Sequence, residues 1–325
     1  MKTPPFKFHR PKSIDEAVNI ASELKNSGDS FDWISGGTDL LPNYKWHINT
    51  KKHVISLANI DEIKTHEPYH IGAMVSLHEL EQGPTHPLIR KAAGTIASTL
   101  IRRSGTVGGN LCLDTRCFWF NQTEDWRRSI DWCHKCDCDT EADCRVIPNQ
   151  NTLCVATYQG DLAPCMMVLG AKIHLAGPDG QRSMKLDEFY ALDGMKRNVL
   201  EVGEFVTHIT LPIESDQLEG DYQKLRLRES WDFPEAGVAA SWKRNDNGIE
   251  QLYVATTACE SIPRLHMEET SVALNEWNGK ESAKILAENI RKTVKPVNNT
   301  YFPPAYRRKM LRVLTKRALA GSWSD

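Results

Sequence analysis

Cysteine is the residue type in this sequence whose positions point most directly to chemistry, because they are clustered. Seven of the nine cysteines lie between residues 112 and 154, and only Cys165 and Cys259 lie elsewhere. The segment shows no sustained helical or strand period, and a loop of this length inside a compact domain needs something to order it. Thiolates gathered around a metal would supply that order. We therefore interpret the segment as a cofactor-bearing insertion rather than a loop of unligated thiols. The clustered residues are Cys112, Cys117, Cys133, Cys136, Cys138, Cys144 and Cys154.

The spacing of these cysteines leaves the choice between zinc and an iron–sulfur cluster open. The pair Cys133 and Cys136 forms a C-x-x-C motif, which occurs in both kinds of site. A structural zinc site usually draws on two close pairs, whereas Cys117, Cys144 and Cys154 stand alone at wide intervals. Wide spacing favours the cluster. Aromatic residues of the segment could provide the apolar surroundings that tune a cluster, or could simply pack the loop. They are Phe118, Trp119, Phe120, Trp126 and Trp132.

Two pairs of glycines indicate a second kind of chemistry, the binding of a phosphate by the backbone. The pairs are Gly36 with Gly37 and Gly108 with Gly109. Glycine has no Cβ, so its N–H group can approach a ligand closely. Neither loop matches the usual dinucleotide-binding or P-loop motif. A tight turn without a ligand would explain either pair alone, but two such loops favour a pyrophosphate site.

A scaffold of alternating helices and strands must position these residues, and the apolar pattern predicts one. Ser13 with Glu16, and Ser76 with Glu79, form capping-box patterns ahead of helices. Asp161 precedes an apolar helix. At this position an aspartate side chain ordinarily caps the first turn of the helix. Strands are expected at residues 31–35, 53–57 and 172–175, and helices at residues 14–26, 77–81 and 87–100.

A change of character near residue 214 predicts a second domain. Strands are expected at residues 221–228, 236–243 and 250–257, and the Asn and Gly at positions 245 to 248 predict a hairpin between the last two. Three helices should follow, at residues 265–277, 281–292 and 304–319. We therefore expect two domains, residues 1–214 and residues 215–325.

Composition excludes several classes of function. The chain has 325 residues with 40 basic and 42 acidic side chains, so its net charge is −2 and nonspecific nucleic-acid binding is not expected. Its longest apolar stretch is interrupted by Lys172 and His174 and is shorter than the ~18 residues that suggest a membrane span. The N-terminal residues show no apolar signal-peptide core, so we expect a reducing cytoplasm, where stable disulfides are rare.

Taken in order, several motifs resemble those of one family. They are SGGTDLL, YHIGAMVSLHELE, IASTLIRRSGTVGGNL, GDLAPCMMVLGA, VLEVGEFVTHITLP, KLRLRESWDFPEAGVAA and YRRKMLRVL, and they span nearly the whole chain. The sequence resembles the FAD-binding medium subunits of the molybdenum hydroxylase, or xanthine oxidase, family. The resemblance implies an α+β fold: a two-part α/β FAD-binding domain of the PCMH type with a Cys-rich iron–sulfur insertion at residues 112–154, then a small α+β domain with a three-stranded antiparallel sheet and helices.

The same resemblance implies which residues bind FAD. In the family, two glycine loops embrace the pyrophosphate, an aspartate contacts the cofactor and some members place a lysine near the flavin. Carried over to this sequence, these residues are Ile34, Ser35, Gly36, Gly37, Thr38, Asp39, Leu40, Thr106, Gly108, Gly109, Asn110, Asp161 and Lys224.

The Cys-rich insertion resembles that of the β subunits of the 4-hydroxybenzoyl-CoA reductase branch, which carry an additional 4Fe-4S cluster. The resemblance implies four ligands, Cys117, Cys133, Cys144 and Cys154. The acidic spacer before Cys144 is longer than that pattern allows, so Cys136 or Cys138 could replace Cys133 or Cys144.

On this resemblance the chain is an oxidoreductase subunit that relays electrons and holds no catalytic residue of its own. It implies a small 2Fe-2S subunit and a large molybdopterin subunit, in a doubled heterotrimer that removes the hydroxyl group of 4-hydroxybenzoyl-CoA or a similar aromatic thioester. A ferredoxin-like protein would donate the low-potential electrons. Two alternatives stay open: an FAD subunit of a xanthine, CO or aldehyde dehydrogenase with outward electron flow, and a noncatalytic interaction module that binds zinc.

Overall fold

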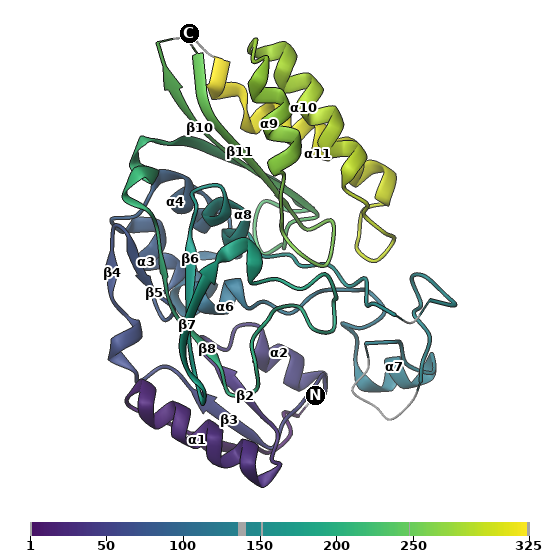
Figure 1. Ribbon diagram of the computed structural model, residues 1–325. Coiled ribbons are helices and arrows are strands. Elements are labelled where there is room, and N and C mark those ends of the chain that lie inside the picture. Colours follow the sequence, from purple (N-terminus) through teal and green to yellow (C-terminus); the bar gives the residue numbers. More distant parts are fainter. Residues whose placement is uncertain (1, 136–140, 151, 247, 324–325) are drawn as a thin grey trace.

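Three β-sheets follow one another along the long axis of the molecule (Figure 1). The computed structural model describes residues 2–135, 141–150, 152–246 and 248–323. The parallel N-terminal sheet and its helix lie at one end, and the C-terminal sheet with three helices lies at the other. The α+β fold expected from the resemblance is confirmed.

The N-terminal sheet presents the first glycine loop. Its strands are β1 (Lys7–His9), β3 (His53–Ser56) and β2 (Phe31–Ile34), all parallel and in that order. Helix α1 (Ile14–Ser27) connects β1 to β2. The Ser13 hydroxyl accepts the Glu16 N–H at its start, and Gly28 adopts φ 74° at its end, as the sequence predicts. Helix α2 (Leu40–Lys45) follows the loop after β2.

The central sheet is antiparallel, in the order β4 (His66–Glu67), β5 (His70–Gly72), β8 (Phe205–Thr210), β6 (Lys172–Gly177) and β7 (Gly180–Lys185). One face places Ile71, Ile173 and Ile209 side by side in the largest apolar core. Short helices pack into that core and carry the second glycine loop. They are α3 (Leu77–Gln82), α4 (Pro87–Gly94), α5 (Thr99–Ser104), α6 (Val107–Leu111) and α8 (Leu162–Met167).

The single helix expected at residues 87–100 is wrong, because the structure divides this segment between α4 and α5. Between them Ala97 adopts φ 46°, which is outside the helical region. The Ser98 hydroxyl then accepts the Ile101 N–H and begins the next helix. A local cap therefore overrides the apolar periodicity.

The C-terminal sheet has four strands rather than the three expected. Their order is β12 (Arg264–Leu265), β11 (Gly248–Thr257), β10 (Ala236–Asn245) and β9 (Glu219–Leu225). The three predicted strands and their hairpin are present, but β12 pairs with β11 where a helix was expected to begin. A two-residue strand is too short to give a periodic signal.

Three helices cover one face of the C-terminal sheet: α9 (Met267–Asn275), α10 (Lys280–Thr293) and α11 (Pro304–Ala318). Val238 and Ala240 of β10 belong to the core shared with these helices, whereas Ala239, on the opposite face, belongs to the core of the central sheet. Both faces of the sheet are therefore covered, which explains why the sequence of β10 is a continuous apolar run.

The Cys-rich segment projects from the body of the molecule, and its described residues form one helix, α7 (Glu124–Ser129) (Figure 1). The Thr123 hydroxyl accepts the Trp126 N–H at its start. The sequence showed no period here, because six residues are fewer than two turns. Cys136 and Cys138 lie outside the described residues.

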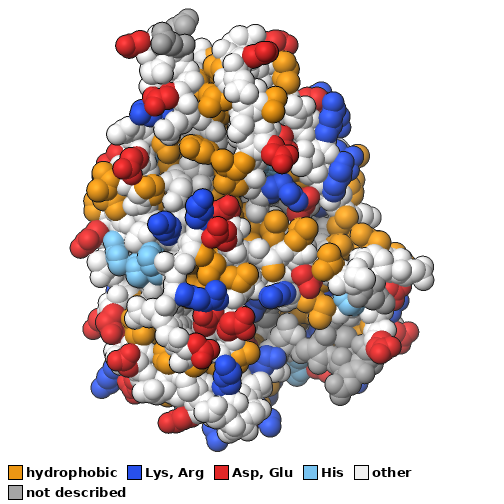
Figure 2. Space-filling view, in the orientation of Figure 1, with side chains coloured by type: hydrophobic (Ala, Val, Ile, Leu, Met, Phe, Trp, Pro, Cys, Tyr) orange, Lys and Arg blue, Asp and Glu red, His pale blue; other side chains and the backbone are white. Residues whose placement is uncertain are grey.

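The surface and helix lengths agree with the composition. Acidic and basic side chains are interspersed over the face shown in Figure 2. Among the described residues, no helix combines the length and apolarity that a membrane span requires.

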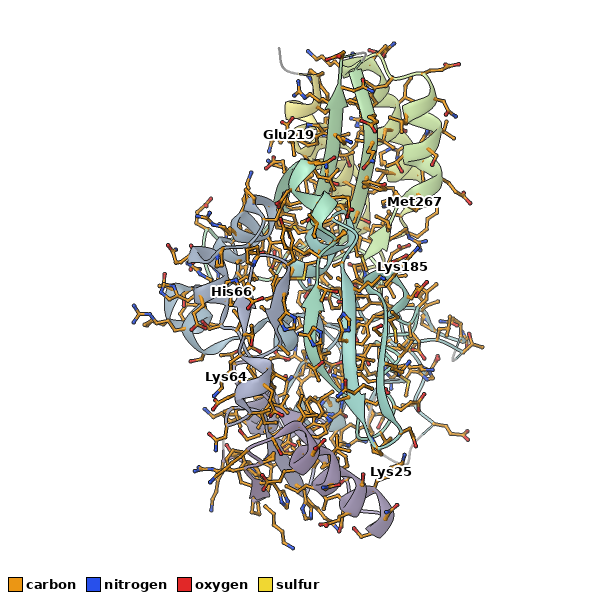
Figure 3. All side chains as sticks on the ribbon, turned by 60° about the vertical axis from the view of Figure 1, so that its left-hand side comes forward. Lys25, Lys64, His66, Lys185, Glu219 and Met267 are labelled. Atoms are coloured by element: carbon orange, nitrogen blue, oxygen red, sulfur yellow. The ribbon has the colours of Figure 1, made fainter. Side chains whose placement is uncertain are left out.

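Three histidine rings stack across the face of the central sheet opposite its apolar core. Figure 3 shows this sheet, with His66 labelled on β4 and Lys185 on β7. The ring centroids of His70 and His208 are 4.3 Å apart, and those of His208 and His174 are 4.1 Å apart. Burial, together with the two neighbouring histidines, lowers the pKa of His208 to about 4.

This stack predicts a pH-dependent stability. An unfolded histidine has a pKa of about 6.5, so between pH 6.5 and 4 the unfolded chain takes up a proton at His208 before the folded chain does. The free energy of unfolding should therefore fall as the pH drops through this range. His208→Asn should reduce the slope, measured by urea unfolding between pH 7 and pH 4.5. Gln181→Asn, an exposed change on β7 that removes no titratable group, is the control; a His208→Asn slope equal to that of wild type would contradict the assignment.

Candidate functional site

The two glycine loops lie against each other. A Cβ on Gly36 would fall on the backbone carbonyl of Ser104, and a Cβ on Gly109 would lie 2.9 Å from the Ser35 hydroxyl. Gly37 adopts φ 67°, a left-handed conformation that glycine takes without strain. Contact between the loops therefore requires glycine, and the structure brings together the two segments that the sequence analysis paired.

The two loops differ in what their N–H groups do. In the second loop, Ala73 accepts the Gly108 N–H at 2.8 Å and the Thr106 hydroxyl accepts the Gly109 N–H at 3.1 Å. In the first loop, the N–H groups of residues 36–39 donate no hydrogen bond within the described part of the chain. Consecutive free N–H groups form an anion-binding concavity. The first loop thus offers the donors, and the second loop supports it.

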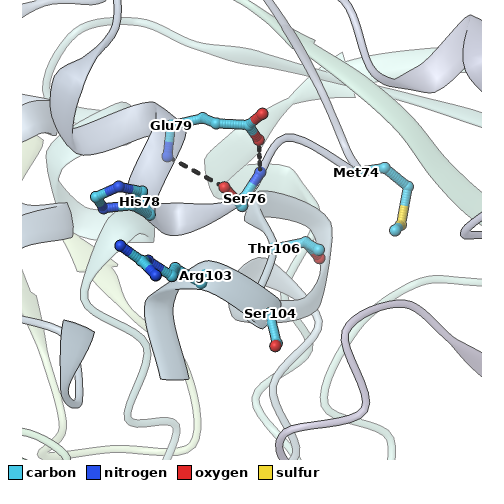
Figure 4. A pocket seen from close by; sticks show the side chains of 7 residues that line it. All are labelled: Met74, Ser76, His78, Glu79, Arg103, Ser104 and Thr106. Carbon is cyan, nitrogen blue, oxygen red and sulfur yellow. Dashed lines mark hydrogen bonds between the residues drawn. The ribbon is translucent and has the colours of Figure 1, made fainter. Parts of the chain in front are cut away.

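A hollow of about 480 Å³ opens beside both loops (Figure 4). Ser104, which touches Gly36, and Thr106 of the second loop both line it, and Arg103 adds a positive charge. The complete capping box of Ser76 and Glu79 fixes the opposite wall. The hollow is lined by Met74, Ser76, His78, Glu79, Arg103, Ser104 and Thr106.

Asp161 makes a buried ion pair instead of capping its helix. The side chain is 2% exposed, and the Lys224 Nζ lies 2.9 Å from its Oδ1. The Tyr222 hydroxyl also donates to Oδ1 at 2.8 Å. Burial and the Asp161 carboxylate raise the pKa of Tyr222 well above its ordinary value, so this hydroxyl stays a donor. The pair joins α8 to β9.

Asn110 takes over the cap that Asp161 does not make. Its Oδ1 accepts the Leu162 N–H at 3.2 Å, so the second loop fixes the start of α8. Ile34 is buried in a small core with Tyr44 and Val54, and Leu40 packs against the same core. Ile34, Leu40 and Asn110, which the resemblance assigned to FAD binding, therefore support the site through their side chains.

Sequence reasoning missed Arg116 as a partner of the first loop. Its guanidinium forms an ion pair with the Asp39 carboxylate, which also accepts the Asn43 side-chain N–H at 3.3 Å. No spacing rule could have found this contact, because the residues are 77 positions apart.

The four cysteines expected as ligands are all buried, with exposed fractions of 6–8%. Burial raises the pKa of the Cys117 thiol to about 12, and charge on Cys133, Cys154 or Cys144 would raise it further. Cys117, Cys133 and Cys154 belong to one small apolar core. We call these four residues the cysteine nest.

A buried lysine lies beside the cysteine nest. The Lys135 Nζ is 2.7 Å from an Asp114 oxygen and donates to the Thr115 hydroxyl at 2.6 Å. Its charge favours the thiolate forms of Cys133 and Cys154. Within the described ranges, no group of three or more His, Cys, Asp or Glu side chains is arranged to hold a metal ion.

Comparison with known proteins shows the family of the chain. The family model for the FAD binding domain in molybdopterin dehydrogenase matches residues 4–214. The chain belongs to this family. It is 24% identical to the carbon monoxide dehydrogenase medium chain of Hydrogenophaga pseudoflava, over 100% of this chain and 99% of the relative. It is 29% identical to the aldehyde oxidoreductase FAD-binding subunit of Escherichia coli K12, over 75% and 79%.

Solved structures show the same fold over the whole length. Carbon monoxide dehydrogenase from Hydrogenophaga pseudoflava matches with a TM-score of 0.78 and 23% identity, covering 99% of both chains. Quinoline 2-oxidoreductase from Pseudomonas putida 86 matches with a TM-score of 0.77 and 18% identity, covering 99% of this chain and 98% of that one. The chain is thus an FAD subunit of the molybdenum hydroxylase family.

The residues present fit the FAD that this family binds. The free N–H groups of the first loop suit a pyrophosphate, and the adjoining hollow offers space and the Arg103 charge. FAD accepts electrons in pairs and passes them on singly. When FAD is bound, the backbone of the first loop would hold the diphosphate, and the second loop would support the first.

The loop contact predicts the effect of a side chain at the glycines. Gly37→Val and Gly109→Val should give folded protein with little flavin, because a Cβ strains the first loop or pushes the loops apart. Flavin absorbance per chain measures occupancy. Ser183→Val, at an exposed position of strand β7 outside both loops, is the control. Full occupancy in both loop variants would contradict the assignment.

Proposed function

We propose that this chain is the FAD subunit of a molybdenum-dependent dehydrogenase of the CO, xanthine or aldehyde type, in which electrons leave molybdenum through FAD to an acceptor. The observation that carries the proposal is the paired glycine loops, within the 211 residues (4–214) matched by the FAD-domain family. The curated relatives favour this alternative over the reductase: they include medium chains and FAD subunits of dehydrogenases for carbon monoxide, nicotinate and glyceraldehyde.

We propose the FAD contacts residue by residue in the same way. The backbone of Ser35, Gly36, Gly37, Thr38 and Asp39 would hold the diphosphate. The second loop from Thr106 to Asn110 would buttress it, and Asp161 with Lys224 would lie at the flavin end. Support comes from the free N–H groups of the first loop and from the Asn110 bond to α8.

The division into two domains is also a proposal. Residues 1–214 would bind FAD and residues 215–325 would form the smaller domain. The family model ends at residue 214, and the C-terminal sheet and helices share a core of their own. The seven cysteines in the described residues are free thiols, which supports the reducing cytoplasm as the location.

A second candidate, the 4-hydroxybenzoyl-CoA reductase type, is favoured by the cysteine nest. Cys117, Cys133, Cys144 and Cys154 would bind a 4Fe-4S cluster that receives electrons from a ferredoxin-like donor. In such a cluster each thiolate binds a different iron atom, so the sulfurs lie farther apart than around one zinc ion. The burial of all four thiols, three of them in one small apolar core, supports this candidate. The zinc-binding noncatalytic module receives no support from the relatives.

Lys135 supports an anionic occupant of the nest. The four thiolates would bring negative charge into a buried site, which is costly without a compensating cation. The Lys135 side chain is 5% exposed, and its Nζ lies 4.7 Å from the Phe120 ring centroid. It is held by Asp114 and Thr115, so its position does not depend on a ligand.

Assembly provides the first test. We propose a small 2Fe-2S subunit and a large molybdopterin subunit as partners, in a doubled heterotrimer, because relatives are named medium chains and FAD subunits. Purification of the tagged chain under mild conditions should recover two dissimilar chains. A flavin-loaded chain that oxidises or reduces a substrate by itself would refute the relay function.

Cysteine replacement tests the cluster. Serine at Cys117, Cys133, Cys144 or Cys154 should lower iron and acid-labile sulfide in anaerobically prepared protein, because each residue is a ligand. Cys165→Ser, at a buried thiol outside the nest, is the matched control. Loss of iron and sulfide on replacing Cys136 or Cys138 instead would show that one of these residues is a ligand in place of a named cysteine. Stoichiometric zinc without labile sulfide would reject the cluster and leave the FAD function standing.

A further inference from the structure

Asp39 is a loop residue whose carboxylate is already engaged. One oxygen pairs with the Arg116 guanidinium, and the other accepts a hydrogen bond from Asn43 in α2. Asp39 makes no side-chain cap for α2, although it precedes that helix. The carboxylate therefore has a different function, which is to hold the first loop against Arg116.

Arg116 belongs to the Cys-rich segment, and its backbone is fixed there. Its N–H donates to the Thr157 carbonyl at 2.7 Å, and the Thr157 N–H donates back to its carbonyl at 2.7 Å. The next residue is Cys117 of the nest, whose N–H donates to the Asn121 side chain at 3.0 Å. A shift of Cys117 must therefore act on Arg116, and Arg116 on the first loop.

The third partner of Arg116 comes from the C-terminal half. The Phe233 ring, in the connection between β9 and β10, lies 4.7 Å from the guanidinium carbon. The Nε of Arg116 is buried and has no hydrogen-bond partner among the described residues. Through its guanidinium and its backbone together, Arg116 thus contacts three segments, and its Nε donor has no partner among the described residues. In Figure 1, α2 and the Cys-rich segment around α7 lie on the same side of the molecule.

We propose that Arg116 is a positioning residue that couples FAD binding to the order of the cysteine nest. The inference rests on the proposed assignment of the first loop to FAD, and it holds for any occupant of the nest. Through Asp39, Arg116 keeps the free N–H groups of residues 36–39 aimed at the diphosphate. By linkage, FAD binding must in turn stabilise the segment that carries Arg116.

The affinity for FAD tests the first half of this coupling. The intact complex is stripped of flavin with chaotropic salt and titrated with FAD, and flavin fluorescence gives the Kd. Arg116→Met and Asp39→Asn should each weaken binding by about 5- to 150-fold, the usual range for coupled sites. The double variant should be no weaker than the single ones, because both remove one interaction. Arg116→Lys, which keeps the charge, should recover part of the affinity.

The matched control is Arg182→Met, which removes a guanidinium from an ion pair with Glu204 at the central sheet. Its FAD affinity should equal that of wild type. Wild-type affinity in Arg116→Met would overturn the coupling while leaving the FAD function intact. A wild-type protein that binds no FAD would instead refute the proposed function.

The protection of thiols tests the second half. FAD should slow the alkylation of Cys117 and Cys154 in metal-free wild-type protein, measured by mass spectrometry of the modified peptides. In Arg116→Met, FAD at saturating concentration should give no such protection, whereas Arg182→Met should behave as wild type. Equal protection in Arg116→Met would show that FAD does not act on the segment through Arg116.

Discussion

The close approach of two backbone segments is the constraint on which the site depends. A Cβ on Gly36 would strike the carbonyl of Ser104, just before the second loop, and a Cβ on Gly109 would strike Ser35, so the loops meet only if these two positions lack a Cβ. The strand before the first loop and the helices around the second loop hold the two loops in contact. Because the N–H groups of residues 36–39 donate no hydrogen bond among the described residues, the contact leaves a row of donors available beside an apolar core.

A buried ion pair fixes the C-terminal half to this site. Asp161 and Lys224 are almost fully buried, and breaking such a pair leaves an uncompensated charge, which costs about 3–5 kcal/mol. Lys224 also donates to the Thr95 carbonyl, so one ammonium group contacts the turn after α4 as well as the start of α8. The C-terminal sheet, apolar on both faces, is thereby held in one orientation over the flavin domain.

Local features of this fold could be predicted from the sequence, and long-range contacts could not. The caps at Ser13 and Ser76, the hairpin of β10 and β11, and the two glycine loops depend on residues close in the chain. The partner of Asp161 lies 63 positions away and that of Asp39 lies 77 positions away, and no periodicity encodes such pairs. The spacing of the glycines alone did not identify a ligand for the loops. The resemblance to a family assigned the loops to FAD binding. The break after α4 was missed because an unusual φ at Ala97 has no signature in an alanine.

Arg116 pairs with Thr157 at the base of the Cys-rich segment. The positions of the two ends of the segment therefore do not depend on how many residues lie between them. Two backbone hydrogen bonds hold the ends of the excursion together. For a flexible loop with fixed ends, each doubling of its length costs only about 0.6 kcal/mol. Residues added or removed at exposed positions between these ends therefore cost the rest of the fold little. The buried residues of the segment, such as Phe120 and Arg127, and the two residues at its base must keep their places.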